Sequence, residues 1–396
     1  MKEEYIRKVT YAPFFSTVSK DWLSLALPMM ISMDIRQDKS ITTSESSHNT
    51  YLYLKKMDLE NEKKLPKKIK EKIAYKNFSD YVLSGDIEGD LENGLSYIID
   101  LYSRKTGESL VLEGVSTDIF ELTDSIGNWI VESIHTNDLR TPRIKGENIH
   151  PKEFYSSDLL ALEYYFKSYW KFHDGEVSGI KELMDDAIER DDKFAMAYTT
   201  RSWAYFTQGN RMAALADMDK ALQYSGSLTE FQVFDVKDYY YSYNNERESR
   251  RKLLEMWVKI HPEDSHPSQQ LMEHFKGGRQ VVKAIAVGEA AFKRGHKDYF
   301  IIELAILYAQ EGNHQKVEEY IRTYKKQFPG DTDILYRLGR IYSNEFKYEK
   351  ALELFREYQT LNPRHFNTAL NISMTQLQLG KIEEVESNVL KAKKFV

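Results

Sequence analysis

The stretch TDILYRLGRIYSNEFKYEKALELFREYQTLNP, residues 332–363, decides the fold of the carboxyl-terminal half of the chain. Apolar, small and aromatic residues recur in it at helical spacing, first as Leu335, Leu338, Gly339 and Tyr342 and then as Ala351, Phe355 and Tyr358. Pro363 ends the second series, because proline lacks an N–H and clashes with the preceding helical turn. The pattern predicts two antiparallel helices that approach each other at the small residues and are packed by the aromatic ones.

The same offsets return every 34 residues along the last part of the chain. The pairs 34 residues apart are Gly175 and Gly209, Gly278 and Gly312, and Pro329 and Pro363, and two such steps lead from Gly312 through Phe346 to Gly380. A 34-residue period with these residue types is typical of tetratricopeptide (TPR) helical hairpins, and residues 158–396 resemble that family. We expect about seven hairpins stacked into an all-α superhelical solenoid, with most signature residues lost in the middle, between Phe231 and Arg294.

The TPR resemblance implies a binding face, because in that family the first helix of each hairpin lines a concave surface that binds a protein or peptide. Carried onto this sequence, that face consists of Thr199, Trp203, Phe206, Ile302, Ile306, Gln310, Tyr336, Arg340, Asn344, Leu370 and Met374. These side chains are mostly apolar and aromatic, which suits a bound helix or an extended hydrophobic peptide. The alternative is that individual members pack on a neighbouring helix or on the amino-terminal domain.

The amino-terminal part follows a different period, with short alternating runs between turn residues. It predicts strands at 8–15, 41–46, 80–88, 95–103 and 108–116, and helices at 22–33, at 66–78 and after Asp118. Asn93-Gly94 and Thr106-Gly107 are typical hairpin turns between the last three strands. The predicted order is β-α-β-α-β-β-β-α, a small α/β sandwich that precedes the helical repeats.

Five pieces of this part carry a second resemblance. They are Tyr11-Ala12-Pro13-Phe14, DYVLSGDI at 80–87, Ile99-Asp100-Leu101, Thr106-Gly107-Glu108 and DIFEL at 118–122. In this order they are similar to the TolB amino-terminal-type domain of bacterial proteins. The resemblance assigns residues 1–136 to that domain and 137–157 to a linker. It implies protein binding in a bacterial signalling or envelope protein without catalytic residues, and favours the periplasm or cell envelope while leaving the cytoplasm open.

Composition limits the remaining classes of protein. The length of 396 residues allows two or three domains, and the net charge of −6 gives no reason to expect a nucleic-acid partner. The absence of cysteine excludes disulfides and thiolate metal sites. No run of residues is apolar enough to cross a bilayer, so we expect membrane proximity only through a segment outside this chain.

The chain also lacks the sequence motifs of common enzymes and cofactor sites, including phosphate-binding loops and nucleophile elbows. The nearest metal-like cluster, HPEDSHP at 261–267, is expected to be a solvated turn and not a metal site. We therefore expect a non-enzymatic scaffold or sensor module without cofactor or metal. The alternative is a regulatory portion that senses a small molecule bound between the two domains.

Overall fold

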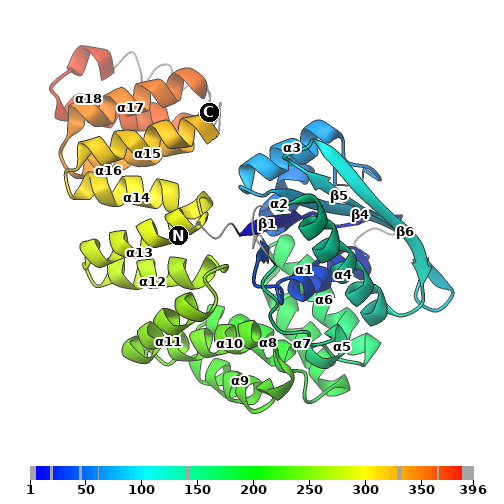
Figure 1. Cartoon of the computed structure of the whole chain (residues 1–396). Helices are drawn as coiled ribbons and strands as arrows, with labels where there is room; N and C mark the ends of the chain where they lie inside the picture. The colour runs from blue at the N-terminus through cyan, green and yellow to red at the C-terminus, as the bar shows by residue number, and fades with distance from the viewer. Residues whose placement is uncertain are drawn as a thin grey trace. The chain divides into compact units, whose positions relative to one another are not determined.

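The computed structural model describes residues 6–17, 21–43, 47–60, 62–139, 143–327, 332–363 and 365–385. By its internal contacts the chain divides into two compact units, Met1–Pro267 and Ser268–Val396. The first unit holds a small sheet followed by helical hairpins, and the second holds further hairpins (Figure 1). The predicted division into 1–136 and 158–396 follows the change from sheet to helices and stays a prediction.

The sheet-bearing part contains six strands and four helices in its described residues. They are β1 (Arg7–Tyr11), β2 (Phe15–Ser16), α1 (Trp22–Ile35), β3 (Ile41–Thr43), α2 (Ser47–Lys56), α3 (Lys67–Lys76), β4 (Tyr81–Asp90), β5 (Gly94–Ser103), β6 (Glu108–Ser116) and α4 (Ile119–Asn137). The strand order is β3-β1-β4-β5-β6, with β2 paired to β4. Strand β1 runs parallel to β3 and β4, whereas β4, β5 and β6 form an antiparallel meander.

Helices cover both faces of this sheet. Consecutive residues of a strand point to opposite faces, and Tyr81 and Leu83 of β4 pack in the same core cluster as α1 and α4. Val82 lies between them in sequence and packs in a second cluster with Ile69 and Ile73 of α3. The expected α/β sandwich is therefore present.

Two details of the predicted order are wrong. The strand expected at 8–15 is two strands, β1 and β2, because Pro13 has no N–H with which to continue the ladder. The N–H of Phe14 instead donates to Ser24 O at 2.8 Å and turns the chain toward α1. An unexpected helix, α2, follows β3, and residues 44–46 of the strand expected at 41–46 lie outside the described residues.

The core of the sheet-bearing part continues into the first hairpins. Helix α1 is buried on nearly all sides, with Ala26, Leu27 and Ile31 fully inaccessible to solvent. The same core cluster includes Leu162 and Phe166, which belong to the first hairpin. Because one core spans both kinds of structure, the sheet and the first hairpins of this unit are expected to unfold together.

The helical region consists of consecutive antiparallel pairs. In the first unit these follow a short helix, and the elements are α5 (Pro151–Phe154), α6 (Leu159–His173), α7 (Ser178–Arg190), α8 (Ala195–Thr207), α9 (Arg211–Gln223), a 3₁₀ turn (Ser225–Ser227), α10 (Glu230–Tyr243) and α11 (Arg247–Ile260). Helix α12 (His266–Gly277) begins at the boundary of the units. The second unit continues with α13 (Val281–Arg294), α14 (Asp298–Gln310), α15 (His314–Gln327), α16 (Asp333–Asn344), α17 (Tyr348–Leu361) and α18 (Phe366–Gln378). No strand occurs in the described residues after Pro151, as the 34-residue period predicts.

A left-handed residue marks the turn between the two helices of each hairpin. These residues are Gly175, Gly209, Asn245, Arg279, Gly312, Phe346 and Gly380, with φ between +56° and +80°. Most are 34 apart, but 36 residues separate Gly209 from Asn245 and 33 separate Arg279 from Gly312. The seven turns agree with about seven hairpins. Gly278 is one residue away from its turn position, and Pro329 lies outside the described residues.

The repeat at residues 332–363 shows why its small residues matter. A Cβ added to Gly339 of α16 would lie 2.6 Å from the Phe355 ring of α17, closer than van der Waals contact. Ala351 and Phe355 are buried at 0% and 1% exposure. The two helices therefore meet at positions that tolerate only small side chains.

Replacing Ala351 with tryptophan is expected to destabilise the second unit by about 1–3 kcal/mol, because overpacking forces neighbouring side chains out of their rotamers. Thermal unfolding followed by circular dichroism measures the change. Glu353→Trp, on the exposed face of the same helix, is the matched control. If Ala351→Trp melted at the same temperature as the control, the assigned contact between α16 and α17 would be wrong.

Asp34, near the end of α1, gives this fold a specific pH dependence. Its carboxylate lies against α4, since a Cβ added to Gly127 would come 2.0 Å from Asp34 Oδ2. Burial, reinforced by the nearby Asp124, raises the Asp34 pKa to about 7 from its ordinary 3.8. The folded state thus holds this proton more tightly than the unfolded state. The resulting stability is fully present below about pH 4 and is lost as pH rises toward 7.

Asp34→Asn is expected to remove this loss of stability at high pH. The free energy of unfolding should rise relative to the parent at pH 8, by at most about 4 kcal/mol because each pKa unit corresponds to about 1.4 kcal/mol. At pH 4 the two proteins should differ much less. Urea unfolding at both pH values measures the difference, and a variant that is less stable than the parent at pH 8 would refute the assigned protonation.

Candidate functional site

A pocket of the helical region lies on the first helices of three successive hairpins, α6, α8 and α10. It has a volume of about 260 Å³. Its lining residues are Ser168, Tyr169, Phe172, Ile180, Met196, Thr199, Thr200, Trp203, Asp235 and Tyr239, and we call it the α6–α8–α10 pocket. Met196, Thr199, Thr200 and Trp203 are three or four residues apart on α8, so they share one face of that helix.

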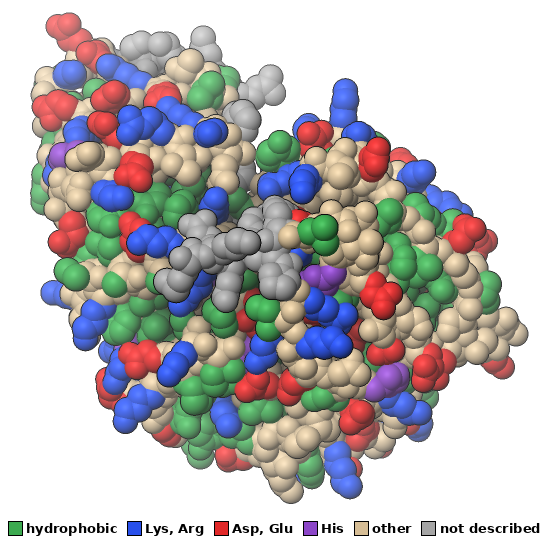
Figure 2. All heavy atoms as spheres, viewed as in Figure 1, with side chains coloured by type: hydrophobic (Ala, Val, Ile, Leu, Met, Phe, Trp, Pro, Cys, Tyr) green, Lys and Arg blue, Asp and Glu red, His purple; other side chains and the backbone are tan. Residues whose placement is uncertain are grey.

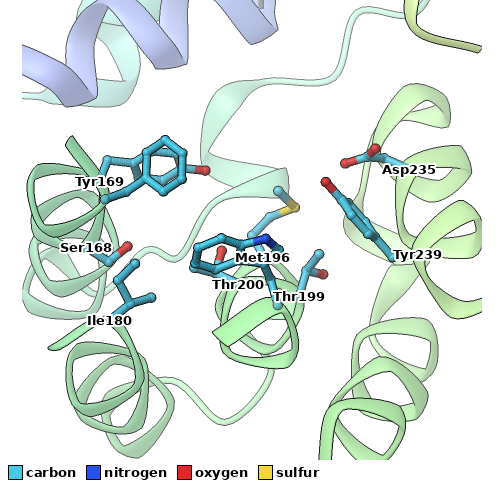
Figure 3. Close-up of a pocket in the computed structure, with 10 residues that line it drawn as sticks. Ser168, Tyr169, Ile180, Met196, Thr199, Thr200, Asp235 and Tyr239 are labelled. Carbon is cyan, nitrogen blue, oxygen red and sulfur yellow. The ribbon is translucent and has the colours of Figure 1, made fainter. Parts of the chain in front are cut away.

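Four of the ten lining residues are aromatic: Tyr169, Phe172, Trp203 and Tyr239. The rings of Phe172 and Trp203 meet edge to face with centroids 5.7 Å apart. Figure 3 shows Tyr169 on one side of the space and Tyr239 and Asp235 on the other, with Met196 and Thr199 between them. Tyr169, Trp203 and Tyr239 are half-buried and Phe172 is 39% exposed, so their rings remain accessible from the pocket.

The electrostatics of the pocket depend on one carboxylate, that of Asp235. Its negative charge is the main cause of the raised pKa of Tyr239. Burial raises the pKa of Tyr169 to about 12, and the Tyr169 hydroxyl also lies 3.0 Å from that of Tyr165. The tyrosines are therefore neutral hydrogen-bonding groups at physiological pH, and Asp235 is the one acidic side chain among the ten lining residues.

The residues predicted for the first unit are only partly brought together. Thr199 and Trp203 line the pocket, although Thr199 is 7% exposed and its Oγ1 donates to Ala195 O at 3.0 Å. Phe206 is not a lining residue, because its ring stacks on Tyr243 with centroids 4.0 Å apart. It is nevertheless 41% exposed at the end of α8.

The predicted residues of the second unit lie on α14, α16 and α18. Ile302 and Ile306 are half-buried, whereas Gln310, Arg340 and Asn344 are exposed and Met374 is 62% exposed. Tyr336 is half-buried, and its hydroxyl accepts a hydrogen bond from Asn371 Nδ2 at 3.2 Å. These helices present a surface that mixes apolar and polar side chains.

Six wall residues of the α6–α8–α10 pocket were not expected from the sequence: Ser168, Tyr169, Phe172, Met196, Thr200 and Asp235. The signal for Tyr169 and Phe172 was present, because Gly175 marks the end of the first helix of its hairpin. Asp235 carried no such signal, since its repeat has lost most signature residues.

The cluster at 261–266 is not the solvated turn that was expected. His261, Glu263 and Asp264 are between 4% and 7% exposed. His261 Nδ1 lies 2.8 Å from Glu263 Oε1, and Asp264 Oδ1 lies 3.4 Å from Arg36 Nη2. Within the described residues, no group of three or more His, Cys, Asp or Glu side chains has the arrangement of a metal site.

Two further properties are the distribution of charge on the surface and the apolar character of the helices. On the face drawn in Figure 2, basic and acidic side chains are interspersed among polar ones. In the part of the chain that the structure describes, no helix combines the length and apolar character needed to span a bilayer.

Comparison with known protein families identifies one repeat in this chain. Residues 332–365 match the family model of the tetratricopeptide repeat. No curated protein was found to match the sequence. The helical pairs and the match together show that a small sheet region is followed by many helices in a TPR-like arrangement.

Several solved structures are similar to this chain at low identity. A tetratricopeptide repeat protein from Parabacteroides merdae is 16% identical with a TM-score of 0.44, over 60% of this chain and 93% of that one. PilF from Pseudomonas aeruginosa is 16% identical with a TM-score of 0.42, over 56% of this chain and 98% of its own. YrrB, a TPR protein with an unusual peptide-binding site, is 18% identical with a TM-score of 0.28, over 56% and 92% of the two chains. Similarity at this level carries no conclusion about function, but residues 332–365 of this chain carry a tetratricopeptide repeat.

Proposed function

We propose that this chain is a non-enzymatic scaffold that captures a protein or peptide on the first helices of its hairpins. The observation that carries the proposal is the α6–α8–α10 pocket, where three helices hold the exposed Phe172 and the half-buried Tyr169, Trp203 and Tyr239 around a hollow. Large aromatic side chains are costly to leave in water. They are also the residues that dominate the binding energy of protein interfaces.

The second unit supports the same proposal through its own exposed side chains. Met374 and Leu370 of α18 are 62% and 39% exposed, and Arg340 of α16 is exposed. Methionine adapts its shape to different apolar partners, and arginine is frequent among residues that dominate binding. A peptide partner therefore has apolar and charged anchors on this face.

The cellular setting belongs to the proposal as well. The TolB-like resemblance of residues 1–136 favours a bacterial signalling or envelope protein, with this chain acting in the periplasm or at the cell envelope. Its support is the order of the five sequence pieces given above. A fractionated bacterial culture that placed the intact chain only in the cytoplasm would contradict the envelope setting.

Selection from a random library of displayed peptides tests the capture proposal. The purified chain should enrich peptides whose binding falls in the variants Trp203→Ala or Arg340→Ala, with a loss of about 2 kcal/mol or more if the residue is a dominant anchor. Met212→Ala, at a 79% exposed position on α9 outside the pocket, is the matched control. Enrichment of no peptide, or equal binding by all three variants, would contradict peptide capture on these faces.

A small-molecule sensor is the second candidate, and one observation favours it. A cavity of about 370 Å³ lies beside β4 and β5, within the range of about 300–1,000 Å³ typical of ligand pockets. Its wall includes Leu54, Leu65 and Ile98, and Lys70 Nζ lies 2.6 Å from Asp100 Oδ2 within it. This cavity belongs to the sheet-bearing part. A metabolite library that produced thermal stabilisation abolished by Ile98→Trp would favour this candidate over the scaffold.

A further inference from the structure

Helices α2 and α3 of the sheet-bearing part carry a concentration of positive charge. Residues 47–78, which include both helices and their connection, contain nine lysines, four acidic residues and no arginine. Lys70 is buried and lies 2.6 Å from Asp100 Oδ2. The other eight lysines are exposed: Lys55, Lys56, Lys63, Lys64, Lys67, Lys68, Lys72 and Lys76.

The two helices lie side by side and form one surface. Leu54 of α2 packs in the same core cluster as Ile69 and Ile73 of α3, against residues of β4 and β5. Lys76 Nζ of α3 lies 4.6 Å from the centre of the Tyr53 ring of α2. Figure 1 shows α3 on the side of β4 and β5 opposite α1 and α4. The inner sides of α2 and α3 therefore cover the sheet, and their outer sides carry the lysines.

Large apolar side chains are exposed among these lysines. Leu52, Met57 and Tyr75 are each 42% exposed. Leu52 lies three residues before Lys55 on α2, and Tyr75 lies three residues after Lys72 on α3, so each shares a helix face with a lysine. We call the eight exposed lysines and these three apolar residues the α2–α3 face.

The charge of the α2–α3 face is poorly neutralised by the protein itself. On α6 and α7 each of the four lysine and arginine side chains lies 2.5–2.7 Å from a carboxylate oxygen. On the α2–α3 face, five lysines form no ion pair and no side-chain hydrogen bond with any residue that the structure describes. These five are Lys56, Lys64, Lys67, Lys68 and Lys72. Their ammonium groups are therefore available to an anionic partner.

We propose that the α2–α3 face docks on the surface of a lipid bilayer that contains anionic lipids. Each lysine beside such a surface contributes about 1 kcal/mol of attraction. Exposed apolar side chains on the same face enter the boundary between the headgroups and the acyl chains, where they leave water. The methylene groups of the lysines pack on that boundary while the ammonium groups stay among the headgroups. This interaction uses a different surface from peptide capture, and neither proposal depends on the other.

The apolar members of the face favour a bilayer over a nucleic acid. Lysines alone would suit either partner, because both present phosphate groups. Leu52 and Met57, however, have no aromatic ring to stack on a base and no group to hydrogen-bond to one. They gain free energy only where they leave water, as at the acyl boundary of a bilayer. The absence of arginine, the side chain most used to read bases, points the same way.

Co-sedimentation of the full chain with lipid vesicles tests the proposal. The chain should bind vesicles of phosphatidylglycerol and phosphatidylcholine, and should not bind vesicles of phosphatidylcholine alone. The triple variant Lys64→Gln, Lys68→Gln and Lys72→Gln should bind about a hundredfold more weakly, because 1 kcal/mol for each lysine corresponds to about a fivefold change. The matched control, Lys193→Gln, Lys252→Gln and Lys259→Gln, removes the same charge from exposed positions of the helical region and should keep the affinity. Circular dichroism checks the fold of both variants.

A second variant distinguishes a bilayer from other polyanions. Leu52→Ser combined with Met57→Ser keeps every charge, so it should weaken binding to the anionic vesicles and leave any binding to a DNA duplex unchanged. No binding to the anionic vesicles, or equal binding by the two triple variants, would overturn the proposal. Tighter binding to the duplex than to the vesicles, with no effect of the serine substitutions, would assign the face to nucleic acid and also overturn it.

Discussion

Replacing Arg7 with leucine is expected to lower the free energy of unfolding by about 3–5 kcal/mol. Arg7 lies on β1 and is fully buried, and Asp138, which follows α4, is 1% exposed. The Arg7 guanidinium donates to the carbonyl oxygen of Asp138, and its Nε lies 3.7 Å from Asp138 Oδ2. The substitution removes the cation beside a buried carboxylate and a donor to the end of a helix.

A double variant separates the ion pair from simple packing. Arg7→Leu combined with Asp138→Leu should recover part of the lost stability, because replacing both members of a buried pair by apolar residues costs much less than removing one. Urea unfolding of the two single variants, the double variant and the parent measures the coupling. Strictly additive effects would show that the two side chains do not interact.

Trp257→Ala is expected to cost about 3–5 kcal/mol, the usual range for removing a large aromatic side chain from a core. Trp257 on α11 is 0% exposed and is the largest fully buried side chain among the described residues. Its ring stacks on Phe234 with centroids 5.4 Å apart and meets Phe231 edge to face at the same distance. Removing the Trp257 side chain therefore leaves a cavity beside the rings of Phe231 and Phe234.

Trp203→Ala is the matched control for this prediction. It deletes the same side chain from a half-buried position on α8, and its expected cost is only about 1 kcal/mol, as for most single substitutions. Calorimetric unfolding of both variants gives the comparison. A larger loss for Trp203→Ala than for Trp257→Ala would mean that Trp203 is a core residue and not part of a binding surface.

The elements with strong local chemistry could be predicted from the sequence. Asp118 caps α4 by accepting from the N–H groups of Phe120 and Glu121 at 2.8 and 3.1 Å. The turn at Asn93-Gly94 joins β4 to β5, where Gly94 has φ +116°. Both rest on local chemistry, because the Asp118 carboxylate accepts from the first N–H groups of the helix, and Gly94 adopts a positive φ readily since it has no Cβ.

The degraded middle of the repeats could be predicted less well for a physical reason. Two of its turns use Asn245 and Arg279 in the left-handed conformation that glycine adopts most easily. Asparagine adopts this conformation more often than other non-glycine residues do, but arginine rarely does, so the turn at Arg279 carries little signal in the sequence. The 36- and 33-residue intervals on either side then shift every other signature position.

In the candidate site too, residues fixed by the local repeat pattern could be predicted, and residues that depend on tertiary packing could not. The position of Trp203 near the end of the first helix of its hairpin could be predicted from its offset to Gly209 alone. Asp235 could not, because its significance arises only when α10 lies beside α8 and α6 and its carboxylate meets rings that are far away in sequence. Helix α2 was missed because its sequence, SHNTYLYLKK, has few strong helix formers, and Tyr51 and Leu54 become buried only through tertiary packing.

Photo-crosslinking of a selected peptide tests most directly whether the first helices form the binding surface. The photoreactive residue p-benzoylphenylalanine is introduced in place of Phe206, three residues from Trp203 on α8, or in place of Met212 on α9. Both positions are exposed, at 41% and 79%. If the first helices form the binding surface, the peptide crosslinks to position 206, excess unlabelled peptide abolishes this crosslink, and none forms from position 212. A crosslink from position 212 alone would contradict this assignment of the binding surface.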